Sequence, residues 1–285
     1  MYKRQLCLSL MWEDELSLEE RVDLTKNAGF DGFFVGYRSD EQIKELRRLA
    51  DEKDMFFQSI HARFHKSNMV WYEDERGDEG IQEVYDAVSA ASKYGVDLVV
   101  AHSYIGFYTG EKPTKAGLDR IKKVLDYAKE LNIKIAYENI EGEEFLDAIM
   151  DAFYKDYDNL GFCWDSGHEQ CYNYSKDMLA KYGAKVFGTH LNDNLGVKDF
   201  NGKMFWYDDL HLLPFDGVID WKDAMERLAK TGFDGPLTFE LKTKHIDDRH
   251  ENDKYCALKK EEYLAEAYTR ACKLGFMFNK IKGIY

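Results

Sequence analysis

Acidic and histidine residues recur at the carboxyl ends of short apolar runs along this chain of 285 residues. The runs and their polar residues are FFQSIHA with His61, DLVVAHS with His102, IKIAYEN with Glu138, GFCWDSGH with Asp165 and His168, VFGTHLND with His190, and PLTFELK with Glu240. A further pair, Asp209 and His211, follows the His190 run. Carboxylates and imidazoles are common ligands of divalent metal ions. The pattern therefore indicates a metal site, provided that the ends of these runs meet in space.

The runs belong to an alternation of β-rich and amphipathic helical segments. Strands are predicted at about 5–10, 32–37, 55–62, 97–103, 133–139, 160–166, 185–191 and 236–242, and helices at about 17–28, 40–53, 80–94, 114–131, 143–154, 175–182, 220–231 and 259–274. This alternation predicts a single (β/α)8 TIM barrel domain over residues 1–285, since such a barrel typically takes about 250 residues. Its strand ends open into one mouth, beside the long loops 66–80 and 193–219. A doubly wound open sheet is the alternative, but its polar residues would come from a few strands rather than six.

Side-chain alternation along the strands predicts which residues face the barrel interior. In the last strand Phe239 and Leu241 suit the helix layer, so Glu240 and Lys242 share the inward parity. Inward carboxylates are costly to bury and repel one another, and a divalent cation relieves both effects. The residues expected around that cation are Glu138, Asp165, His190 and Glu240. Each of these residues has another explanation when it is considered alone. A histidine can be hydrogen-bonded in the core, and Asp165 can cap a turn at Ser166. Six strands would, however, need six such separate explanations.

The composition excludes several classes of protein. The chain carries 53 acidic and 39 basic residues, a net charge of −14, which argues against broad nucleic-acid binding. Its five cysteines are odd in number and lack CxxC spacing, which is typical of reduced thiols in a cytoplasmic protein. No apolar run reaches 18 residues, so no membrane span is expected. The oligomeric state is left open, and a homo-oligomer is compatible with the sequence.

Six segments together resemble a known group of barrels. They are AHSYIG (101–106), AYENIEG (136–142), WDSGH (164–168), FGTHLNDN (187–194), DLHLLPFDGVIDW (209–221) and TFELK (238–242). They look like the xylose-isomerase-like TIM barrel superfamily, which includes sugar and sugar-phosphate isomerases and epimerases, inosose dehydratases and endonuclease IV. The resemblance spans nearly the whole chain, and its motifs are specific to the superfamily but separate its members poorly.

In the epimerase branch, the resemblance implies that Glu138, Asp165, His190 and Glu240 bind one divalent metal, Zn²⁺ or Mn²⁺, with Co²⁺ and Mg²⁺ also compatible. Glu138 and Glu240 would act as the acid and base, transferring a proton through a metal-bound enediolate of a sugar or sugar phosphate. The remaining polar residues would bind the substrate: His61, His102, His168, Asp209, His211 and Lys242.

Three other functions remain open, two enzymatic and one non-enzymatic. In the endonuclease branch, nine of these residues would ligate three zinc ions of an apurinic endonuclease: His61, His102, Glu138, Asp165, His168, His190, Asp209, His211 and Glu240. Against that reading, this chain has LLPFDG (212–217) where the endonucleases have a glycine-rich turn, a longer loop before Asp209, and no evident basic DNA-gripping loop. An inosose dehydratase would use the same metal and bases. A barrel that binds a sugar without converting it is the non-enzymatic alternative.

Overall fold

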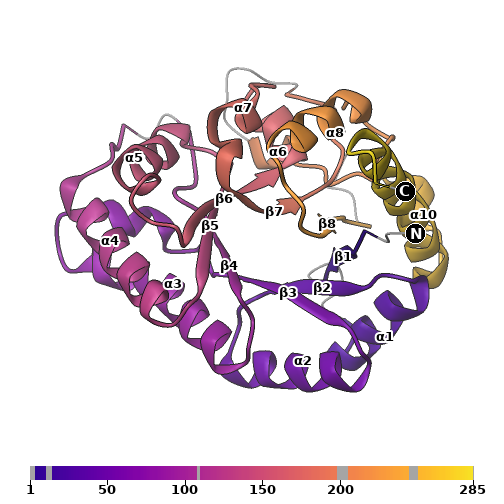
Figure 1. The fold of residues 1–285 in the computed structure, drawn as a ribbon, viewed down its shortest axis with the longest axis horizontal. Coiled ribbons are helices and arrows are strands. Elements are labelled where there is room, and N and C mark those ends of the chain that lie inside the picture. Colours follow the sequence, from indigo (N-terminus) through magenta and orange to yellow (C-terminus); the bar gives the residue numbers. More distant parts are fainter. Residues whose placement is uncertain (1–3, 11–14, 108–109, 198–204, 244–249, 285) are drawn as a thin grey trace.

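The eight predicted strands are present, and every neighbouring pair is parallel (Figure 1). The computed structural model describes residues 4–10, 15–107, 110–197, 205–243 and 250–284. The strands are β1 (Leu6–Ser9), β2 (Gly32–Gly36), β3 (Phe56–His61), β4 (Leu98–Ala101), β5 (Lys134–Glu138), β6 (Leu160–Asp165), β7 (Val186–His190) and β8 (Leu237–Phe239). Their order in the sheet is β7-β6-β5-β4-β3-β2-β1-β8. Beyond β7, Leu191 bridges to Phe239 and its N–H donates to the Thr238 carbonyl at 2.8 Å, so the barrel is nearly closed.

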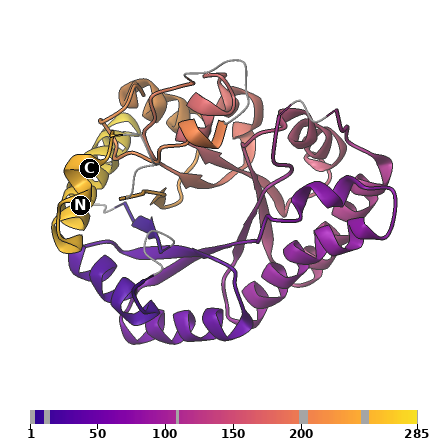
Figure 2. The same ribbon diagram turned by 180° about the vertical axis from the view of Figure 1, so that it is seen from behind.

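Helices surround the strands on the outside, and the described segments nearest the two chain ends lie close together, with Arg4 3.2 Å from Asn279 of α10 (Figures 1 and 2). The α-helices are α1 (Leu18–Ala28), α2 (Asp40–Glu52), α3 (Arg76–Lys93), α4 (Lys115–Glu130), α5 (Glu143–Phe153), α6 (Ser166–Cys171), α7 (Met178–Tyr182), α8 (Trp221–Lys230), α9 (Asp253–Cys256) and α10 (Lys260–Ile281). Short 3₁₀ segments are η1 (Ser67–Trp71), η2 (Gly183–Lys185) and η3 (Phe205–Asp208). The single (β/α)8 TIM barrel predicted from the sequence is confirmed.

Local sequence signals explain where several helices begin. Before α1, the Ser17 side chain accepts from the Glu20 N–H at 3.2 Å, and Glu20 accepts from the Ser17 N–H at 2.9 Å. This is the capping box expected at that position.

Two predictions of secondary structure were wrong. The loop expected over 66–80 contains η1 and the first turn of α3, and the segment after β6 forms α6 at once, because Asp165 caps it.

Two apolar layers hold the barrel together. The larger lies between strands and helices, and the smaller fills the barrel interior with Leu98, Val100, Ala136 and Cys163. Side chains alternate along a strand, so Ala136 and Glu138 of β5 point to the same side. Because Ala136 lies in the barrel interior, Glu138 also points inward, two residues closer to the carboxyl end of the strand. None of the described helices has the length and apolar character needed to cross a bilayer.

Candidate metal centre

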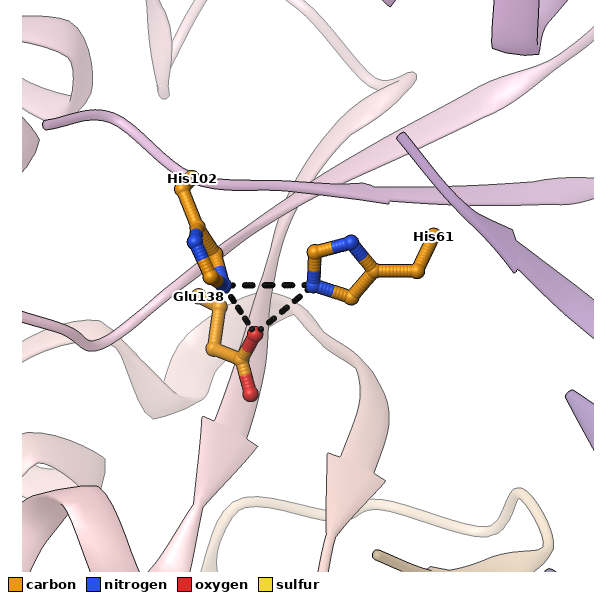
Figure 3. A group of neighbouring side chains, drawn as sticks. All are labelled: His61, His102 and Glu138. Carbon is orange, nitrogen blue, oxygen red and sulfur yellow. Dashed lines mark hydrogen bonds and ion pairs between the residues drawn. The ribbon is translucent and has the colours of Figure 1, made fainter. Parts of the chain in front are cut away.

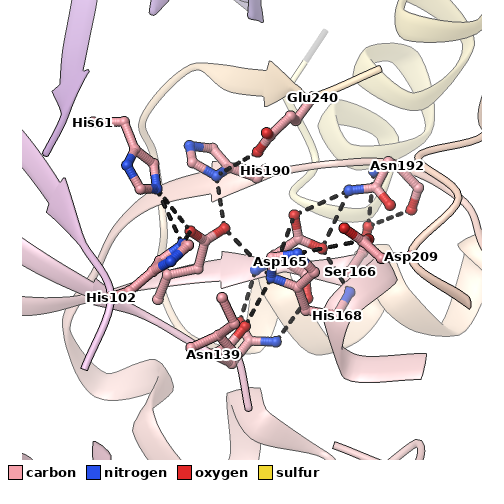
Figure 4. Close-up of polar contacts among 12 residues, drawn as sticks. His61, His102, Asn139, Asp165, Ser166, His168, His190, Asn192, Asp209 and Glu240 are labelled. Carbon is pink, nitrogen blue, oxygen red and sulfur yellow. Dashed lines mark hydrogen bonds and ion pairs between the residues drawn. The ribbon is translucent and has the colours of Figure 1, made fainter. Parts of the chain in front are cut away.

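The carboxyl ends of six strands and the loop after β7 bring nine acidic and histidine side chains together at one end of the barrel (Figure 4). Besides a group that joins Cys163 to Glu138 and His190, the ligand atoms of these side chains form three groups within the described residues, each with all atoms within 4.8 Å of one another. The groups are His61, His102 and Glu138; Glu138, Asp165, His190 and Glu240; and His168, Asp209 and His211. Glu138 belongs to two of them. The four residues expected to share one cation therefore converge.

The first group joins β3, the end of β4 and β5 (Figure 3). The Nε2 atoms of His61 and His102 lie 3.2 Å apart, and each contacts Oε2 of Glu138, at 3.2 and 3.0 Å. All three side chains are at least nine-tenths buried. Two imidazole nitrogens and one carboxylate oxygen thus point at one small volume.

The central group is organised around His190 on β7. Its Nδ1 lies 2.7 Å from Oε1 of Glu138 and 3.0 Å from Oε2 of Glu240. The two carboxylates therefore flank one point beside the imidazole. Asp165 completes the group, and its carboxylate also accepts from the His168 N–H at 2.7 Å and from the Asn192 amide at 3.0 Å. Asp165 thus caps α6 and also belongs to the central group.

The third group lies in the mouth, between α6 and the loop after β7. Nε2 of His211 lies 2.8 Å from Oδ2 of Asp209, and Nε2 of His168 lies 3.7 Å from Oδ1. The ammonium of Lys242 is 3.5 Å from Oδ2 of the same carboxylate, and the Lys242 side chain is half-exposed. Lys242 therefore reaches the mouth from its edge.

Backbone carbonyls orient three of the histidines. Nδ1 of His61 lies 2.7 Å from the Ala62 carbonyl, and Nδ1 of His168 and of His211 each lie 3.0 Å from a carbonyl, those of Asn139 and Glu240. Because a carbonyl only accepts, Nδ1 carries the hydrogen and Nε2 keeps its lone pair toward the acidic group. This is the tautomer that binds a metal through Nε2. The donor set therefore fits divalent metal ions.

Burial and the neighbouring charges shift the titration of the central residues. Burial lowers the pKa of His102 to about 4 and raises the pKa of Asp165 to about 6. Burial would also raise the pKa of Glu240, but the hydrogen bond and charge of His190 together with the charge of His211 outweigh burial and lower that pKa to about 2. For His190 burial acts in the opposite direction, and Cys163 and Glu138 raise its pKa well above the usual value. Without a metal, a protonated His190 thus supplies the positive charge between the two glutamates.

Several residues that shape the site were missed from the sequence. The Asn139 amide donates to the Asp165 carbonyl at 2.8 Å, and Asn192 holds the Asp165 carboxylate. Both lie within two residues of an expected ligand, which is the signal that could have found them. Phe34 stacks on His190, and no sequence signal distinguishes it from the other core aromatics. Phe215 was noticed in the sequence, because it stands in the LLPFDG segment (212–217) where similar barrels have glycine. Its φ is +76°, in the left-handed region that glycine favours.

The family model described as "xylose isomerase-like TIM barrel" matches residues 22–266. The chain belongs to this family. It is 26% identical over 301 residues to the uncharacterized protein y4fM of Sinorhizobium fredii, covering 91% of this chain and 93% of that protein. Two solved family structures share the fold. The IOLI protein with a bound zinc atom matches with a TM-score of 0.71, 21% identity and coverage of 97% and 99% of the two chains. A D-tagatose 3-epimerase-like protein matches with a TM-score of 0.65, 22% identity and coverage of 94% and 98%.

Proposed function

We propose that this barrel is a divalent-metal-dependent isomerase or epimerase that acts on a sugar or sugar phosphate by proton transfer. The observation that carries the proposal is the convergence of Glu138, Asp165, His190 and Glu240 at the open end of the barrel. The zinc atom of the IOLI protein and the D-tagatose 3-epimerase-like structure support the same class of chemistry.

The four converging residues would hold the metal through three carboxylates and one imidazole, a donor set that suits Zn²⁺ or Mn²⁺ and is compatible with Co²⁺ or Mg²⁺. When bound, the metal supplies Lewis-acid polarisation of a substrate carbonyl, which acidifies the adjacent C–H. The binding of substrate hydroxyls falls to the histidines and Asp209 around this group, and Lys242 would neutralise a developing oxyanion from the edge of the mouth.

The two glutamates differ in access to the substrate. The Glu240 side chain is 16% exposed and that of Glu138 is 1% exposed. Glu240 is therefore the residue that would remove the substrate proton. Glu138 lies near the same nitrogen of His190 and would return a proton from the other side in an epimerase. In an isomerase, Glu240 would serve both steps.

Solvent deuterium exchange tests this proposal before the product is known. The protein is incubated in D₂O with ketoses and ketose phosphates, separately with Zn²⁺, Mn²⁺, Co²⁺ and Mg²⁺, and the substrates are examined by NMR. Exchange at the carbon next to the carbonyl, abolished by a chelator and restored by metal, is the expected result. Absence of exchange with every ketose and metal would exclude the proposed proton transfer for that panel. Product analysis then separates isomerisation from epimerisation and from the loss of water that an inosose dehydratase would cause.

One observation favours a second candidate, a zinc-dependent apurinic endonuclease. Glu138 directs Oε2 at His61 and His102, and Oε1 at His190, so its two oxygens face two separate groups of side chains that would each hold an ion. Elemental analysis showing three zinc ions per chain, with chelator-sensitive cleavage of abasic duplex DNA, would favour this candidate over the isomerase. One metal per chain and no cleavage would eliminate it.

A further inference from the structure

The group that joins Cys163 to Glu138 and His190 adds a sulfur atom to the surroundings of the metal centre. The ligand atoms of these three side chains all lie within 4.8 Å of one another. All three residues are almost completely buried. Glu138 and His190 also belong to the central group, so Cys163 is the residue that this set of atoms adds.

The strands place the sulfur of Cys163 on the inner side of the central group. Cys163 on β6 is paired with Glu138 of β5, and Asp165 follows it by two residues on the same strand. Side chains two residues apart point to the same side of a strand, so Cys163 lies below Asp165, away from the mouth. The sulfur therefore approaches the central group from inside the barrel.

The neighbouring strand β7 leaves room beside this sulfur. The residue of β7 paired with Cys163 is Gly188, which has no side chain, and a Cβ atom there would lie 3.7 Å from Sγ of Cys163. Two residues further along β7 is His190, and the thiol is a hydrogen-bond partner of its imidazole. The sulfur thus contacts one of the residues expected to hold the metal.

A buried cysteine often serves only as a small apolar residue, and Cys163 does pack in the interior layer with Leu98, Val100 and Ala136. It differs from these three residues because its side chain carries a donor atom. Burial raises the pKa of the Cys163 thiol to about 12, so the sulfur keeps its proton while no cation is near. A divalent cation changes this, since a thiol that coordinates a metal is deprotonated.

We propose that Cys163 is an additional ligand of the metal held by Glu138 and His190, and that its sulfur makes the centre prefer Zn²⁺ and Co²⁺ to Mn²⁺ and Mg²⁺. The inference rests on the proposed function, because it takes the central group to hold the metal of the proposed reaction. As the bond from sulfur to metal forms, the S–H bond breaks and the proton passes to solvent. Thiolates favour zinc, whereas carboxylates and water suit manganese and magnesium.

The separation of the atoms is compatible with one shared ion. Bond lengths of about 2.0–2.3 Å in a tetrahedral zinc site place its ligand atoms roughly 3.3–3.8 Å apart. The atoms of Cys163, Glu138 and His190 lie within 4.8 Å of one another before any metal is bound. Small side-chain rotations are therefore enough to bring all three onto the same ion.

Absorption spectroscopy of the full-length protein loaded with Co²⁺ tests this assignment. A bond between cobalt and a thiolate gives a charge-transfer band in the near ultraviolet, which oxygen and nitrogen ligands do not give. The wild-type protein should show this band, and Cys163→Ala should lose it. Cys171→Ala is the matched control, because Cys171 is as buried as Cys163 but belongs to none of the possible ligand groups among the described residues. This variant should keep the band.

Metal competition measures the selectivity of the same variants. The ratio of the dissociation constant for Mn²⁺ to that for Zn²⁺ should fall at least about 10-fold in Cys163→Ala, because Zn²⁺ loses its sulfur ligand. Cys171→Ala should leave this ratio as it is. If Cys163→Ala fails to fold, Cys163→Ser fills nearly the same volume and provides the same test.

A wild-type spectrum without the band, or a band that Cys163→Ala leaves in place, would overturn the assignment. A ratio of dissociation constants that this substitution does not change would also overturn it. A band that depends on Cys163 in a protein that catalyses no deuterium exchange would support the sulfur ligand and reject the isomerase. Metal-dependent exchange in a protein without the band would reject the sulfur ligand and leave the isomerase standing.

Discussion

The ring of Phe34 lies flat against the imidazole of His190, with centroids 4.3 Å apart and planes inclined by 10°. Phe34 is on β2 and His190 on β7, so the contact crosses the barrel interior. Both side chains are almost completely buried. Because Nδ1 of His190 lies between Glu138 and Glu240, the phenyl ring limits how this imidazole can rotate.

Replacing Phe34 with leucine should therefore weaken metal binding as well as stability. We expect the metal dissociation constant to rise about 10-fold, the lower end of the effect seen when residues that orient a ligand are lost. The free energy of unfolding should fall by about 1–2 kcal/mol. Phe57→Leu is the control. Phe57 is also buried, but it packs against Phe33 in the apolar layer between the strands and the helices. Chelator competition and urea unfolding measure the two effects, and equal losses of metal affinity in both variants would contradict the role given to Phe34.

Metal binding at the central group should release a proton. Burial lowers the pKa of His190, but the adjacent Cys163 and Glu138 raise it well above its usual value. We therefore expect this imidazole to be protonated at neutral pH before metal binds. A ligating imidazole must be neutral, so binding releases about one proton from His190 and affinity should rise about tenfold per pH unit near neutrality. Calorimetry in two buffers with different ionisation enthalpies counts the protons. Metal affinity that is constant between pH 6 and 8 would contradict this charge arrangement.

The fold could be predicted from the sequence because its signals are local and repeat eight times. Apolar runs, the Ser17 capping box and the alternation of strand and helix each depend on a few neighbouring residues. The convergence of the expected ligands could be predicted for a related reason, since Glu138 and Asp165 each end a strand and parallel strands end at one mouth. The contact of Phe34 with His190, in contrast, joins positions far apart in the chain, and only the closed barrel brings them together.

Two glutamate substitutions should separate the roles of the acid and base. Glu240→Gln keeps the shape of the side chain but removes the proposed base and one carboxylate of the metal group, so kcat measured at saturating metal should fall by about 10²–10⁴ with little change in KM. Glu138→Gln also loses a carboxylate that contacts His61, His102 and His190, so metal content should fall together with kcat. Circular dichroism should show that both variants fold. Unchanged turnover in both would leave a barrel that binds its ligand without converting it.

Glu141 should make stability depend on pH. It is buried next to the site, and burial raises the pKa of its carboxyl to about 7. The fold thus favours the protonated form, and this contribution to stability is complete below about pH 4 and is lost as the pH rises through 7. Glu141→Gln cannot ionise, so its free energy of unfolding relative to wild type should increase by up to about 3 kcal/mol between pH 4 and pH 8. Glu130→Gln, on the exposed end of α4, is the control and should show no such trend in urea unfolding.

Asp193 should hold the loop that carries Asp209 and His211. Its buried carboxylate accepts from the backbone N–H groups of Asn194, Phe215 and Ile219 and from the Trp221 indole, at 2.8–3.2 Å. Asp193→Asn replaces an acceptor oxygen with an NH₂ group that faces donors. We expect it to lower the free energy of unfolding by about 2–4 kcal/mol.

The same substitution should also loosen the third ligand group, because the backbone of Asp193 pairs with Leu212, next to His211, at 2.8 and 2.9 Å. Asp220→Ala is the matched control in the same loop, since Asp220 caps α8, and its loss should cost about 1 kcal/mol without changing the metal content. Urea unfolding and elemental analysis of the two variants provide the comparison. Should Asp193→Asn unfold no more readily than Asp220→Ala and keep its full metal content, the carboxylate would not be what positions this loop against the mouth.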